Sequence, residues 1–72
     1  MKKIVLRNMY EKTPEEKMIG IAATEEELWK MGFAYLKENN IPQNPYSRMW
    51  TENGETFCDF GSWSWFLVIT NL

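Results

Sequence analysis

The sequence predicts an α+β domain in which a single helix packs on one face of a four- to five-stranded, mostly antiparallel sheet, in the order β-β-α-β-β(-β). A helical segment with a clear N-terminal cap lies in the middle of the chain, over residues 25–39. Short segments rich in β-branched and aromatic residues lie on both sides of it. An Asn-Gly pair divides the C-terminal part into hairpin strands. With 72 residues, the chain is expected to form one domain over residues 1–72.

The N-terminal segment predicts a β-hairpin. Residues 3–10 combine apolar and β-branched side chains in a largely alternating pattern, which is typical of a strand. The charged segment 11–17 contains a proline and is either a loop or a single helical turn. Residues 17–22 form a second short apolar segment that would close the hairpin.

The helix is the clearest local prediction. Thr24 is followed three residues later by a glutamate, which is the capping-box pattern, and acidic residues fill the first turn. The spacing predicts a helix over 25–39 with a buried stripe of Leu28, Gly32 and Leu36. Gly32 lowers helix propensity, but in the middle of this stripe it would let the helix backbone approach a sheet closely.

The C-terminal half predicts the remaining strands. Residues 46–51 and 56–60 flank Asn53-Gly54, which is a strong signal for a tight hairpin turn. Residues 62–69 alternate at first and then become apolar on both faces, as in a central strand. Alternate residues of this last strand share a face, so Trp63, Trp65, Leu67 and Ile69 lie together, either under the helix or on the second face of the sheet.

The composition argues against several classes of function. A net charge of −2 lacks the basic excess of a typical nucleic-acid binder. Cys58 is the only cysteine and histidine is missing, so we expect no internal disulfide, no metal site and no cofactor. No apolar run reaches the roughly 18 residues of a membrane span, and the first residues lack a signal-peptide core. We therefore expect a cytoplasmic protein that does not bind membranes.

The order of segments resembles short uncharacterised proteins of Gram-positive bacteria and their phages. In these proteins a strand-Gly-strand-helix segment, here residues 19–28 onward, precedes a C-terminal Asp-aromatic-Gly-Ser-Trp-Ser-x-Phe strand, here residues 59–66. The resemblance covers most of the chain, and its C-terminal motif is the more specific part. It implies no activity, cofactor or site residue. It implies a phage-like context, in which an accessory that modulates a host protein is one possible role.

Catalytic chemistry has few candidates. Cys58 lies in phase with Thr56 and Phe60 and is expected to be a small buried residue rather than a nucleophile. Asp59 is the acid of the aromatic region, and we expect its carboxylate to accept hydrogen bonds from the backbone amides that follow it. Glu52 and Glu55 flank the predicted turn and are expected to be solvated. We therefore expect no enzymatic activity.

One helix can cover only one face of the predicted sheet. The second face would then expose apolar side chains, drawn from Val5, Met9, Phe57 or Met49, Phe66 and Val68. A large exposed apolar patch usually marks an interface. We therefore expect a protein partner or a second copy of the chain on this face.

The expected interface consists of aromatic residues and one arginine: Tyr46, Arg48, Trp50, Trp63 and Phe66. Trp and Tyr bury a large area at low entropic cost, and arginine adds directional hydrogen bonds. The leading hypothesis is a non-catalytic domain that binds a protein partner through this aromatic sheet face. The alternative is a single-stranded nucleic-acid binder that stacks bases on the same rings. Arg48 is the only basic residue of the set, which favours the protein partner.

Overall fold

The computed structural model describes residues 1–10, 12, 15–44 and 48–72. The predicted α+β class is confirmed, because one helix packs on a five-stranded sheet. The elements follow in the order β1 (Lys2–Asn8), β2 (Glu16–Ala22), α1 (Glu25–Glu38), β3 (Arg48–Glu52), β4 (Glu55–Asp59) and β5 (Trp65–Asn71). Thr13 and Pro14, with which the single helical turn considered within 11–17 would begin, lie outside the described residues, whereas Glu16 belongs to strand β2 and not to a helical turn.

The sheet is antiparallel throughout, with the strand order β2-β1-β5-β4-β3. The C-terminal strand β5 therefore lies between β1 and β4, with β2 and β3 at the two edges. This position explains why Leu67, Val68 and Ile69 are all apolar, since they are buried on both faces of the sheet. The prediction of a central last strand is confirmed.

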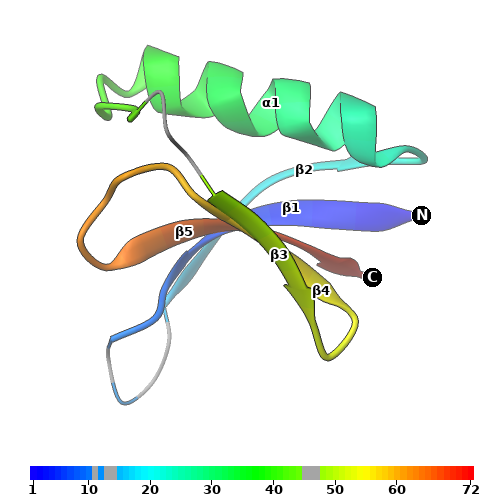
Figure 1. The fold of residues 1–72 in the computed structure, drawn as a ribbon. Helices are drawn as coiled ribbons and strands as arrows, with labels where there is room; N and C mark the ends of the chain where they lie inside the picture. Colours follow the sequence, from blue (N-terminus) through cyan, green and yellow to red (C-terminus); the bar gives the residue numbers. More distant parts are fainter. Residues whose placement is uncertain (11, 13–14, 45–47) are drawn as a thin grey trace.

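The sheet is strongly twisted (Figure 1). Helix α1 lies above β2 and β1, and it also contacts β5. The β1–β2 and β3–β4 hairpins turn down and away from the helix on opposite sides, so the second face of the sheet is concave (Figure 1). This second face, which carries no helix, is called the open face below.

The helix begins and ends as its sequence indicates. The Thr24 hydroxyl accepts a hydrogen bond from the backbone N–H of Glu27 at 3.3 Å. The helix ends at Glu38, and Asn40 adopts a left-handed conformation with φ of 56°. Within the helix, Leu28, Gly32 and Leu36 are buried, which confirms the predicted stripe.

Gly32 lies where the helix packs tightly against the sheet. A Cβ atom placed on it would lie 2.7 Å from Ile4 Cδ1 and 3.2 Å from Leu67 Cδ1. Both neighbouring side chains are fully buried, so they have little room to move. The close approach expected from the position of this glycine is therefore confirmed.

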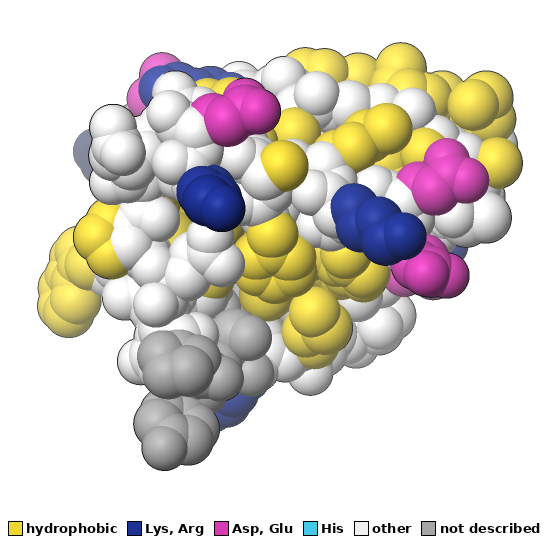
Figure 2. All heavy atoms as spheres, turned by 90° about the horizontal axis from the view of Figure 1, so that it is seen from above, with side chains coloured by type: hydrophobic (Ala, Val, Ile, Leu, Met, Phe, Trp, Pro, Cys, Tyr) yellow, Lys and Arg dark blue, Asp and Glu magenta, His cyan; other side chains and the backbone are white. Residues whose placement is uncertain are grey.

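Hydrophobic side chains flank the helix on both sides, with charged residues on its outer surface (Figure 2). On one flank Trp29 and Phe33 pack against the core, with ring centroids 6.3 Å apart. Met31 lies over Gly20 of β2, where a Cβ atom would come within 2.6 Å of its sulfur. The core between helix and sheet consists mainly of Ile4, Leu6, Leu28, Leu36, Cys58, Phe60, Leu67 and Ile69.

The predicted start of the last strand is wrong by three residues. Strand β5 begins at Trp65, and Trp63 lies in the preceding loop with 88% of its surface exposed. Side chains end the regular alternation here: Asp59 Oδ1 accepts a hydrogen bond from Gly61 N–H at 3.0 Å, and Ser62 Oγ accepts one from Trp65 N–H at 3.3 Å. Gly61 itself has φ of +99°. Trp63 therefore does not lie under the helix, whereas Trp65 packs against the core there.

Candidate protein-binding surface

The open face is closed at its centre by the protein's own side chains. Val5, Phe57 and Val68 form a buried cluster on this face, and Phe66 packs against it. The expectation that this face would be largely uncovered is therefore wrong for its centre. No second helix covers it among the described residues; instead, long side chains from the strands lie across it.

Three rings form an aromatic cluster on the open face: Trp50, Phe57 and Phe66. Trp50 stacks on Phe57 with centroids 5.4 Å apart and planes 15° apart. Phe66 meets Trp50 edge to face at 5.8 Å. The register explains the stack, because Trp50 of β3 and Phe57 of β4 are directly paired. Trp50 keeps 36% of its surface exposed at the edge of the sheet.

Arg7 lies across the open face beside the aromatic cluster. Its Nη1 and Nη2 atoms donate to Glu55 Oε1 and Oε2 at 3.0 and 2.7 Å, and its Nε donates to Glu16 Oε1 at 2.6 Å. The guanidinium also lies 6.0 Å from the centroid of Phe57. Only 14% of the Arg7 side chain is exposed. This arginine and its two carboxylates are called the Arg7 network.

The hydrogen bonds between Arg7 and Glu55 stabilise the charged forms of both groups. Hydrogen bonding from Arg7 lowers the pKa of Glu55 below its ordinary value of 4.5, against the opposing effect of desolvation. The hydrogen bond to Glu55 raises the pKa of Arg7, again in opposition to burial. The bidentate pair is of the geometry in which arginine–carboxylate contacts are strongest.

The prediction that Glu55 is solvated is wrong. Glu55 follows the turn, but its side chain points back over the open face and is 27% exposed. Its partner Arg7 lies on β1, which is separated from β4 by β5 in the sheet. Sequence patterns within the hairpin could not indicate this contact, since it depends on strand order and on the concave shape of the face.

Arg48 and Asp59 border the aromatic cluster. Arg48 shares a face with Trp50, two residues further along β3, and its side chain is 80% exposed. Its Nη2 lies 3.8 Å from Asp59 Oδ2. The other oxygen of this carboxylate accepts the Gly61 N–H, which confirms the predicted capping role of Asp59 for the Gly61 amide.

The interface residues predicted from the sequence do not all lie on one surface. Arg48, Trp50 and Phe66 lie together on the open face. Trp63 lies apart from them and stacks on Tyr10, with centroids 6.2 Å apart. Tyr46 lies outside the described residues.

The Trp63–Tyr10 pair joins two loops at one end of the sheet. The backbone N–H of Met9 donates to the carbonyl of Ser64 at 2.9 Å, which holds the loops together. Both rings are largely exposed, so they form a second aromatic surface that is distinct from the aromatic cluster.

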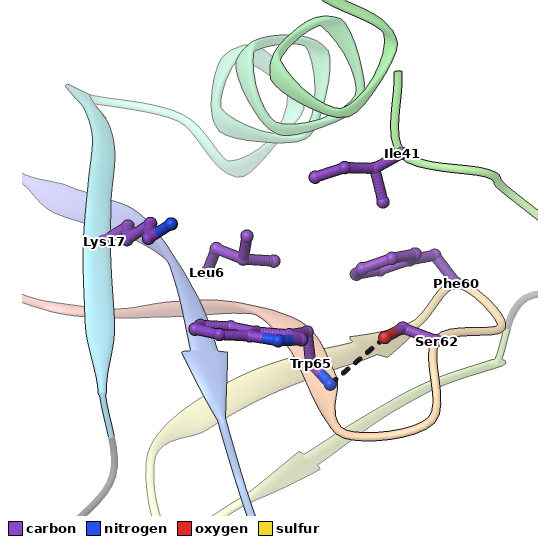
Figure 3. Close-up of a pocket in the computed structure, with 6 residues that line it drawn as sticks. All are labelled: Leu6, Lys17, Ile41, Phe60, Ser62 and Trp65. Atoms are coloured by element: carbon purple, nitrogen blue, oxygen red, sulfur yellow. Dashed lines mark hydrogen bonds between the residues drawn. The ribbon is translucent and has the colours of Figure 1, made fainter. Parts of the chain in front are cut away.

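A cavity of about 240 Å³ opens on the opposite, helix-bearing side of the sheet (Figure 3). Its lining residues come from β1, β2, β5 and the two long loops: Leu6, Lys17, Ile41, Phe60, Ser62 and Trp65. The Lys17 Nζ atom lies 5.6 Å from the Trp65 ring centroid. The cavity offers an apolar floor with one amine at its rim, which suits a small apolar group more than a reacting one.

The Cys58 thiol is fully buried beneath the helix-bearing side. Across the described ranges, no cluster of three or more cysteine, aspartate or glutamate side chains could hold a metal ion. In the same part of the chain, no helix is long and apolar enough to cross a membrane.

Comparisons with protein families, with curated proteins and with solved structures found no match to this chain.

Proposed function

We propose that this domain is a non-catalytic binding module whose protein partner contacts the aromatic cluster on the open face. The observation that carries this proposal is the partly exposed indole of Trp50, held against Phe57 and Phe66. Tryptophan and arginine are the residues that most often dominate the binding energy of protein interfaces. A ring already held in place by its neighbours loses little conformational freedom on binding.

The surroundings of Trp50 also suit an interface. Arg48 borders the indole, and its exposed guanidinium can form hydrogen bonds at the rim. The Arg7 network fixes the floor of the face beneath, so a partner would meet a preformed surface. The resemblance to phage and Gram-positive proteins favours a host protein as the partner, and this is part of the proposal.

Single-stranded nucleic acid is a second candidate partner, favoured by the exposed Trp63–Tyr10 stack. Such rings can stack bases without sequence preference. The cations of the open face weigh against a phosphate backbone there, because Arg7 is paired with two glutamates and Arg48 lies beside Asp59. Phosphate binding would require cations that are not already paired with carboxylates.

Affinity capture from lysate separates the two candidates. The tagged wild type, Trp50→Ala and Trp63→Ala would be compared with and without nuclease, after circular dichroism confirms that each is folded. We expect a protein that survives nuclease, is retained by Trp63→Ala and is weakened at least roughly 30-fold by Trp50→Ala, as for a hot-spot tryptophan. Equal recovery of that protein by folded Trp50→Ala would contradict the proposal. Nucleic acid lost on nuclease treatment and with Trp63→Ala would favour the second candidate.

A further inference from the structure

Strand β3 is an exposed edge of the sheet. It is the last strand in the order β2-β1-β5-β4-β3, and all five of its residues, Arg48–Glu52, are exposed. An exposed edge presents backbone N–H and C=O groups to which another strand can pair. The other edge, β2, differs because its register with β1 shifts near Ile4 and Val5, and such irregularities hinder edge pairing.

The hairpin turn determines which groups of β3 point outward. Asn53 and Gly54 both have positive φ, as in a two-residue type I′ turn. In such a hairpin the residues beside the turn, here Glu52 and Glu55, form a hydrogen-bonded pair. Alternation along the strand then directs the backbone groups of Met49 and Thr51 toward the open edge.

The residues of β3 are complementary to their own antiparallel copy. When two such strands are centred on Trp50, Met49 lies opposite Thr51 of the second copy, so the outward backbone groups meet. Arg48 then lies opposite Glu52 of the second copy, on both sides of the centre. Registers centred on Met49 or Thr51 also match hydrogen bonds, but they lose both of these opposite-charge pairs.

We propose that two copies of this chain associate through their β3 strands, paired antiparallel about a two-fold axis at Trp50. The two five-stranded sheets then form one continuous sheet. Trp50 lies opposite its own copy in a non-hydrogen-bonded pair, where side chains approach most closely. Because Arg48, Trp50 and Glu52 share the open face, the charge pairs and both aromatic clusters join on that face.

The interface of five residues per chain is small. It is below the standard size of about 1,600 Å² for stable complexes, so we expect a dissociation constant in the micromolar range or weaker. The association uses the edge of β3 and does not depend on the protein-partner proposal. A dimer can therefore be sought with the purified chain alone.

Charge reversal tests the proposed register. In Arg48→Glu, glutamates face glutamates across the axis, and in Glu52→Arg, arginines face arginines. We expect each variant alone to weaken self-association at least 10-fold in sedimentation equilibrium at up to several hundred micromolar. An equimolar mixture of the two restores both charge pairs, so we expect a heterodimer within a few-fold of the wild-type affinity. Thr51→Pro removes an outward N–H and should also abolish pairing while leaving the hairpin intact.

Several results would overturn this inference. A wild type that stays monomeric at these concentrations would overturn it. Single variants that dimerise as tightly as the wild type would also overturn it. A folded pair of variants that fails to associate when mixed would show that the register is wrong. If either single variant fails to fold, the double variant Arg48→Glu/Glu52→Arg decides in its place, since a folded monomeric double variant would contradict the register.

Discussion

At the scale of single residues, Arg7 connects three strands across the open face. Its side chain lies over Phe57 and connects β1 to Glu16 of β2 and Glu55 of β4. In the sequence, Arg7 is a single arginine that follows three apolar residues, and this pattern does not indicate that it connects three strands. The sequence pattern predicted the neighbouring apolar residues, but the partners of Arg7 follow only from the strand order.

Removal of the Arg7 guanidinium should destabilise the domain. Arg7→Ala leaves Glu55 and Glu16 without their donor and uncovers Phe57, so we expect the free energy of unfolding to fall by about 2–3 kcal/mol. Urea denaturation measures this change. Arg48→Ala is the matched control, because its exposed ion pair should contribute less than about 1 kcal/mol. Equal effects of the two variants would show that the Arg7 network does not stabilise the fold.

The lowered pKa of Glu55 predicts a loss of stability in acid. Below its ordinary value of 4.5, the unfolded chain binds a proton at Glu55 more readily than the folded chain does. The free energy of unfolding should therefore fall as the pH decreases from about 4.5 toward the lower folded pKa. Glu55→Gln should reduce this slope in thermal unfolding measured between these pH values. A slope that is unchanged in the variant would assign the acid sensitivity to other carboxylates.

At the scale of elements, local signals predicted most of the structure. The capping threonine and the Asn-Gly turn each act within a few residues, and both are confirmed. The alternation predicted for the last strand holds only from Trp65 onward. The position of Trp63 was predicted wrongly because an alternating pattern does not reveal where side-chain hydrogen bonds end the strand. Asp59 and Ser62 turn the chain before β5 begins, so Trp63 enters a loop.

The contact between α1 and the sheet depends on Gly32. Gly32→Leu improves helix propensity but places a large side chain against buried Ile4 and Leu67, so we expect about 1–3 kcal/mol of destabilisation. Ala34→Leu is the matched control, since Ala34 is exposed on the same helix. Thermal unfolding should show a lower Tm for the first variant and little change for the second. A raised Tm for Gly32→Leu would contradict the close packing described here.

At the scale of the whole molecule, the order of the strands decides which surfaces remain for a partner. Helix α1 covers the β2 and β1 side, whereas the β3–β4 hairpin projects away from it (Figure 1). The uncovered face was predicted from the number of elements. Its closed centre was not, because the sequence alone cannot show that Arg7 and Trp50 lie across it. Arg48, Trp50 and Phe66 were predicted as interface residues, and the structure brings them together; their role in binding stays a prediction.

The central claim is that a partner covers the aromatic cluster, and hydroxyl-radical footprinting of the captured complex tests it most directly. The chain contains its own control, since Trp50 and Trp63 are both accessible but lie on different surfaces. We predict that oxidation of Trp50 falls in the complex while oxidation of Trp63 is unchanged. Protection of Trp63 with no change at Trp50 would contradict the claim and move the binding surface to the loops.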